Sequence, residues 1–128
     1  MAMTALATTD NGIDRAESLE AAACLFRGFS DPSRLTILRH LALGEHRVTD
    51  LTAHVGLSQS TVSKHLACLR DCGLVTSRPQ GRASVYSLTH PDALDDLFAA
   101  AERLLALTGD AVTLCANYGT NTLPTGAP

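Results

Sequence analysis

The sequence has 128 residues, of which 45% are hydrophobic, 18% charged and 4% aromatic, which is enough for one small domain. Ten basic against thirteen acidic side chains give a formal net charge of −3, which excludes a broadly cationic surface, so any nucleic-acid site must be local. No stretch approaches the roughly 20 apolar residues of a membrane helix, and no basic start precedes an apolar run. We therefore expect a cytoplasmic protein without membrane contact, whose four cysteines are reduced.

Both ends of the chain are poor in apolar anchors, so we expect tails over residues 1–14 and 119–128 around one domain over residues 15–118. Apolar residues at helical spacing near the start of that domain predict a first amphipathic helix that ends near Ser30. This stripe consists of Leu19, Ala22, Ala23, Phe26 and Phe29.

Capping residues then predict three further helices. Asp31 can accept hydrogen bonds as an N-cap before a proline, which indicates a second helix extending to Gly44. A brief third helix over residues 48–55 is followed by Gly56, and Ser58 can cap a fourth helix that ends at Gly73. The expected buried stripe of the fourth helix is Val62, Leu66 and Leu69. Two short helices joined by a glycine turn indicate a helix-turn-helix.

The remaining elements complete a winged version of this motif. Two β-prone runs, 74–76 and 83–88, flank the turn-rich segment 78–82 and predict a hairpin, or wing. Pro91 opens a last long helix whose apolar face is wider than one small domain can readily cover. That face consists of Leu94, Leu97, Phe98, Ala101, Leu104 and Leu105. We expect a mainly α winged helix-turn-helix that dimerises through its first and last helices.

Residues 58–82 carry four basic side chains and one acidic side chain, whereas the rest of the chain has a net charge of −6. This asymmetry, together with short polar groups on the fourth helix, predicts a local DNA-binding surface. The candidate contacts are Ser58, Gln59, Ser60, Thr61, Ser63, Lys64 and His65 on the helix, with Arg78 and Arg82 on the hairpin. A symmetric dimer would double these contacts and require a palindromic operator in double-stranded DNA.

Cys68 and Cys72 lie four residues apart on the fourth helix, so both thiols fall on one face. They are either small buried apolar residues or two ligands of a metal site. Cys115 is a candidate third ligand beyond the last helix, and Cys24 on the first helix is an additional candidate. A sulfur-only site prefers thiophilic ions such as Cd²⁺, Pb²⁺ or Hg²⁺.

Other metal and catalytic motifs are absent from the sequence. The cysteines show no C-x-x-C spacing, and the five histidines form no compact ligand set along the chain. No catalytic motif or glycine-rich phosphate loop occurs, so we do not expect an enzyme.

The segments FSDPSRLTILRHL, LTAHVGLSQSTVSKHLACLRDCGLV and GRASVYSL resemble the ArsR/SmtB family of dimeric metal-sensing repressors. The segment HLACLRDCGLV is most similar to the cadmium- and lead-sensing CmtR branch of that family. The resemblance implies that Cys68, Cys72 and Cys115 are the metal ligands, with the tail ligand supplied by the partner subunit.

We therefore expect an apo homodimer that represses an operon and is released by Cd²⁺ or Pb²⁺, with Hg²⁺ and Zn²⁺ as further candidate ions. One alternative keeps the DNA-binding module but makes oxidation of Cys68 and Cys72 the signal. Another is a thiol-rich metal buffer that does not bind DNA.

Overall fold

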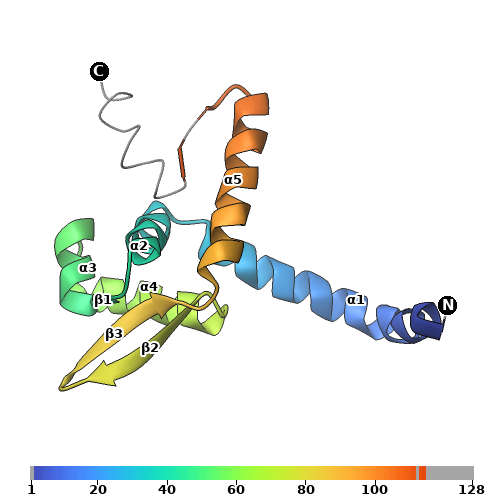
Figure 1. The fold of residues 1–128 in the computed structure, drawn as a ribbon, viewed down its shortest axis with the longest axis horizontal. Helices are drawn as coiled ribbons and strands as arrows, with labels where there is room; N and C mark the ends of the chain where they lie inside the picture. Colours follow the sequence, from blue (N-terminus) through green and yellow to red (C-terminus); the bar gives the residue numbers. More distant parts are fainter. Residues whose placement is uncertain (1, 112, 115–128) are drawn as a thin grey trace.

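The computed structural model describes the backbone of residues 2–111, 113 and 114, and their side chains from residue 15 onward. Within that part of the chain, five helices and a small antiparallel sheet follow the order of a winged helix-turn-helix (Figure 1). The elements are α1 (Ala2–Gly28), α2 (Pro32–Ala42), β1 (His46–Arg47), α3 (Val48–Val55), α4 (Gln59–Asp71), β2 (Val75–Gln80), β3 (Ala83–Leu88) and α5 (Pro91–Leu107). No helix among the described residues is both long and apolar enough to span a membrane.

The predicted capping residues start and stop the central helices. Asp31 Oδ1 accepts hydrogen bonds from the backbone amides of Ser33 at 2.7 Å and Arg34 at 3.2 Å, so α2 begins at Pro32 as expected. Ser58 Oγ accepts from the Thr61 amide at 3.2 Å and caps α4. Gly56 follows α3 with φ of 79°, a left-handed conformation that favours glycine and reverses the chain between α3 and α4.

The sheet contains one more strand than the sequence predicts. Its order is β1-β3-β2, because the two-residue β1 pairs with β3 through His46 opposite Tyr86. The hairpin strand β2 also extends to Gln80, so Arg78 lies within the strand instead of in the turn. Pro79 is tolerated there because β2 is an edge strand, where a missing amide donor interrupts no inner pairing.

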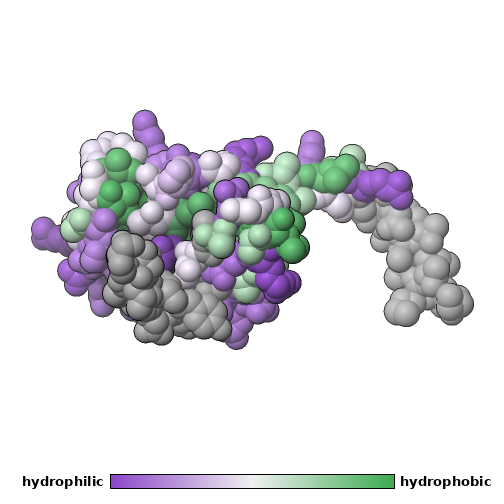
Figure 2. Space-filling model, turned by 90° about the horizontal axis from the view of Figure 1, so that it is seen from above, coloured by the Kyte–Doolittle hydropathy of each residue, from purple (hydrophilic) through white to green (hydrophobic). Residues whose placement is uncertain are grey.

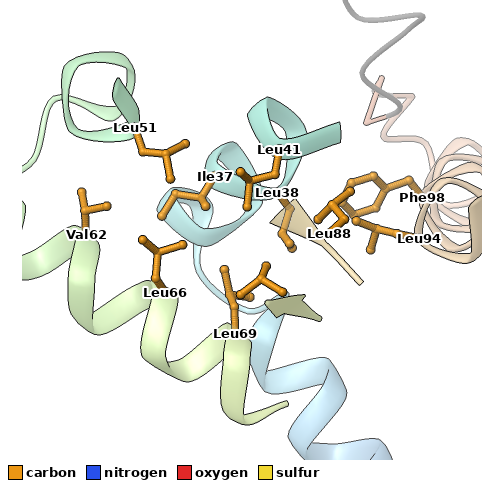
Figure 3. Packing of buried hydrophobic residues seen from close by; sticks show 11 residues of the cluster. Ile37, Leu38, Leu41, Leu51, Val62, Leu66, Leu69, Leu88, Leu94 and Phe98 are labelled. Carbon is orange, nitrogen blue, oxygen red and sulfur yellow. The ribbon is translucent and has the colours of Figure 1, made fainter. Parts of the chain in front are cut away.

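The core lies where α2, α3 and α4 meet under β3 and α5 (Figure 3). The predicted stripe of α4 is confirmed, because Val62, Leu66 and Leu69 are all completely buried. Phe98 of α5 closes the other side of the core and meets Phe29 edge to face, with ring centroids 5.8 Å apart. Burying the stripe points the opposite side of α4 toward solvent.

Helix α1 projects away from the rest of the molecule, and apolar residues lie along its exposed surface (Figures 1 and 2). Leu19 is 67% exposed and Phe26 is 58% exposed, so the predicted stripe of the first helix is not covered within one chain. Leu104 on α5 is also largely exposed. Helix α1 begins at Ala2, inside the segment predicted as a tail, and the domain boundaries at 15 and 118 stay predictions.

Truncating the α4 stripe should destabilise the fold, because Leu66 is fully buried and its removal leaves a cavity. We expect Leu66→Ala to lower the free energy of unfolding by about 2–5 kcal/mol. Leu43→Ala is a matched control, since Leu43 is exposed, and its effect should stay below about 0.5 kcal/mol. Urea denaturation at one fixed protein concentration measures both, and equal losses would contradict this assignment of the core.

Candidate functional site

A polar surface covers the side of α4 that does not pack on the core. Ser58, Gln59, Ser60, Ser63 and Lys64 are all exposed, as expected for groups that contact a ligand across this face. Thr61 is half-buried, and its hydroxyl accepts a hydrogen bond from Ser58 at 2.9 Å, which places it in the cap of the helix. The helix therefore presents a short row of hydroxyl, amide and ammonium groups.

His65 is oriented differently from the other candidates on α4. It is half-buried, and its Nδ1 lies 3.2 Å from a terminal guanidinium nitrogen of Arg34 on α2. Arg34 also donates to the carbonyl oxygens of Gly28 at 3.3 Å and Arg27 at 2.8 Å. This network joins α1, α2 and α4, so the structure gives His65 a contact within the protein.

The wing carries the two predicted arginines and one that the sequence analysis missed. Arg82 is exposed at the hairpin tip, whereas Arg78 forms an ion pair with Glu45, and both partners are about half exposed. Arg47, which directly precedes α3, lines a groove of about 430 Å³ together with Gln59 and Arg82. Arg47 could have been identified from the sequence, because it is a basic residue directly before the first helix of the helix-turn-helix.

Two free thiols meet where α1 passes the end of α4, and a third lies close by. Cys24 Sγ lies 2.7 Å from Cys72 Sγ, and Cys72 Sγ also lies 2.9 Å from the carbonyl oxygen of Cys24. Cys68 lies one helical turn before Cys72 and contributes to the electrostatic environment of its thiol. We call Cys24, Cys68 and Cys72 the thiol cluster. Cys115, the third ligand expected from the sequence, lies outside the described residues.

The closeness of α1 and α4 explains how Cys24 joins the pair on α4. A Cβ atom on Gly28 would lie 2.9 Å from Leu74 Cδ1, in the segment after α4, and 3.4 Å from Leu69 Cδ2, so the Leu74 side chain would have to move to admit it. Gly28 therefore fits the packing at the end of α1, where Arg34 donates to the carbonyl oxygens of Gly28 and Arg27. Cys24 lies about one helical turn before Gly28, over the C-terminal end of α4.

The surroundings of Cys72 favour its protonated form. Partial burial, followed by the hydrogen bond with Cys24 and the proximity of Cys24 and Cys68, raises the pKa of Cys72 to about 12. The Cys72 thiol therefore keeps its proton at neutral pH when no metal is bound. Free thiols are soft donors, so this set suits a thiophilic ion better than a hard, oxygen-seeking one.

Three histidines also come together, which the sequence analysis did not expect. His40, His46 and His54 lie on α2, β1 and α3, and each offers a ring nitrogen within 4.8 Å of the other two. The histidines form no ligand motif along the chain, and tertiary packing is what brings these three together. No local spacing in the sequence signals it.

Comparisons with known proteins agree with this fold. The family described as bacterial regulatory protein, arsR family, matches residues 31–77. A probable mercury resistance operon repressor from Streptomyces lividans is 38% identical over 96 residues, which are 75% of this chain and 76% of that protein. The transcriptional regulator CmtR from Mycobacterium tuberculosis is 40% identical over 90 residues, which are 70% of this chain and 76% of that protein.

Solved structures give the same result. The solution structure titled as the cadmium metal-sensor CmtR from Mycobacterium tuberculosis has a TM-score of 0.50 and 44% identity, over 59% of this chain and 81% of that one. A homodimeric winged helix-turn-helix DNA-binding domain from Mycobacterium bovis has a TM-score of 0.62 and 30% identity, over 72% of this chain and 89% of that one. These relatives are named as regulators or sensors, not enzymes. On this sequence identity and coverage, the chain belongs to the arsR family of bacterial regulatory proteins.

Proposed function

We propose that the protein is a metal-responsive transcriptional repressor that binds a palindromic operator as an apo homodimer and is released by a thiophilic ion. One observation carries this proposal: the thiol cluster includes two residues at the end of α4, the helix whose exposed face holds the candidate DNA contacts. A ligand on the cluster therefore acts directly on the helix that would read the DNA.

The uncovered apolar faces of α1 and α5 support the homodimer. Leu19 and Phe26 on α1 and Leu104 on α5 leave a substantial apolar area in water, which association with a second copy would bury. A two-fold dimer would set its two α4 helices in successive major grooves, about 34 Å apart. The relative from Mycobacterium bovis is titled as homodimeric, which agrees with this arrangement.

Cys68 and Cys72 would hold the ion together with Cys24, the third member of the thiol cluster. Thiolates bind Cd²⁺, Pb²⁺ and Hg²⁺ strongly, and they can also bind Zn²⁺. The names of the relatives, a mercury resistance repressor and a cadmium sensor, support an ion of this class. The resemblance to the CmtR branch keeps Cys115 as a further candidate ligand.

The coupling between the cluster and DNA would run through the crossing of α1 and α4. Cys24 is fixed to α1, and the contacts at Gly28 and Arg34 hold α1 against α4 and α2. Drawing the three thiols together would change how α4 is held relative to the dimerising helix α1. A coupling free energy of about 1–3 kcal/mol would lower operator affinity by roughly 5- to 150-fold.

The DNA-binding surface makes a prediction about salt dependence. We expect Arg82→Ala to weaken operator binding and to reduce the slope of log affinity against log salt concentration by about 2 per dimer, one phosphate contact in each subunit. Gln59→Ala removes no charge, so it should weaken binding without changing the slope. Fluorescence anisotropy with a duplex recovered by selection from random DNA measures both quantities.

Arg15→Ala is the control for net charge, since Arg15 is exposed on α1 away from α4 and the wing. It removes the same charge and should leave the slope unchanged. If it lowers the slope as much as Arg82→Ala does, the wing makes no specific phosphate contact.

The thiol cluster makes a second prediction. Anaerobic Cd²⁺ titration of the reduced protein should produce an ultraviolet thiolate-to-metal band that saturates at one ion per subunit. We expect Cys24→Ser, Cys68→Ser and Cys72→Ser each to reduce this band and to abolish Cd²⁺-driven release from the duplex. Binding of the metal-free variants to DNA should stay near that of the unmodified chain.

Cys115→Ser is the comparison variant. A band that weakens in Cys115→Ser and is unchanged in Cys24→Ser would assign the third ligand to the tail and contradict the role given to Cys24. A protein that binds Cd²⁺ tightly but no DNA in low salt would instead be a thiol metal buffer.

A redox switch is a second candidate, because Cys24 and Cys72 already lie with their sulfurs 2.7 Å apart. The reaction would join these two sulfurs, with two protons and two electrons passing to an oxidant such as hydrogen peroxide, which becomes two waters. The sequence pairs Cys68 with Cys72 for this role, whereas the geometry favours Cys24 with Cys72. Release from DNA by peroxide, without any response to Cd²⁺, would favour this candidate.

A further inference from the structure

The histidine trio, His40, His46 and His54, is a cluster of ligand atoms separate from the thiols. The rings of His40 and His54 stack with centroids 4.4 Å apart and planes 17° apart, and His46 meets both edge to face. One ring nitrogen of each histidine lies within 4.8 Å of a ring nitrogen of each of the other two. The trio lies on α2, β1 and α3, whereas the thiols lie on α1 and at the end of α4.

A hydrogen bond to the backbone sets the tautomer of His46. Its Nδ1 lies 2.7 Å from the carbonyl oxygen of Gly44, so Nδ1 must carry the proton and donate it. The lone pair is then on Nε2. A histidine that ligates a metal through one nitrogen commonly donates its other N–H to a backbone carbonyl, which fixes the tautomer.

The closeness of the three rings also favours a bound cation. Packing three imidazoles together is unfavourable when they are protonated, because like charges repel. A cation that accepts their lone pairs removes that repulsion.

The spacing is within reach of a tetrahedral ion. Zn–N bonds of about 2.0–2.1 Å place two ligand nitrogens about 3.3 Å apart, so the nitrogens need to approach by up to about 1.5 Å. The stacked rings of His40 and His54 must also turn, so that their in-plane lone pairs converge on one ion. His54 is exposed and His40 and His46 are half-buried, so side-chain rotation can supply this movement.

We propose that His40, His46 and His54 form a second metal site, which takes a borderline divalent ion, Zn²⁺, on three imidazoles. A fourth position would remain open to water, as in other three-ligand zinc sites. The Arg39 guanidinium opposes a cation here, so the site is weaker for Zn²⁺ than the thiol cluster. An ion in this site would join α2, β1 and α3. It would tie α3, the first helix of the helix-turn-helix, to α2 and to β1, which pairs with the wing strand β3.

The test is a Zn²⁺ titration of the reduced full chain, followed through the imidazole C–H signals of all five histidines by NMR. His65 lies on α4 and His90 lines a groove shared with Cys72, so these two report on the thiol cluster. After the thiols are filled, we expect the signals of His40, His46 and His54 to shift together and to saturate with one further ion.

Single substitutions give the decisive comparison. His46→Gln should abolish the Zn²⁺ response of His40 and His54, whereas His90→Gln, at the exposed N-cap of α5, should leave the response of the trio intact. The proposal is overturned if no signal of the trio moves in tenfold excess Zn²⁺, or if His40 and His54 respond equally in His46→Gln. Neither result bears on Cd²⁺ binding or on DNA affinity, so this site and the proposed repressor function fail independently.

Discussion

Burial of the apolar stripe of α4 is the constraint on which the rest of the molecule depends. Val62, Leu66 and Leu69 are fully buried against α2 and α3, and this fixes the rotation of α4 about its own axis (Figure 3). Once that rotation is set, Gln59 and Lys64 must face solvent. The same rotation turns the thiols at the C-terminal end of α4 toward α1. Burial of this one stripe therefore positions both the polar face and the thiols of α4.

The electrostatics of the wing show how an acidic chain can present a basic site. Arg47 and Arg82 line one groove beside α4, so the positive charge is concentrated where the helix is polar. Arg78 is held by Glu45, and this exposed ion pair contributes little stability on its own. A phosphate group can compete with Glu45 for Arg78 at small cost, so the pair does not remove Arg78 from the proposed interface.

The crossing of α1 and α4 links the proposed sensing and dimerising surfaces. Gly28 leaves room for the side chains of Leu69 and Leu74, and Arg34 joins the end of α1 to α2 and to His65 on α4. The same α1 carries Cys24 on one side and the uncovered residues Leu19 and Phe26 elsewhere. The contacts between α1 and α4 would therefore link three features. These are a ligand bound to the thiols, the position of α4 and the contact with a second copy.

The sequence by itself determined the five helices, the hairpin and the surfaces of α4, because these depend on neighbours along the chain. Asp31 and Ser58 as caps, Gly56 as the turn and the spacing of Leu66 and Leu69 are local signals, and the structure confirms them. The spacing of Cys68 and Cys72 also placed both thiols on one side of α4.

Tertiary structure alone decided which distant residues meet. It brought Cys24 to Cys72, gathered His40, His46 and His54, paired β1 with β3 and gave Arg78 a carboxylate partner. Each of these contacts depends on the angle and separation at which two or more elements pack. Those quantities follow from the fit of complete side-chain surfaces, which local spacing does not encode.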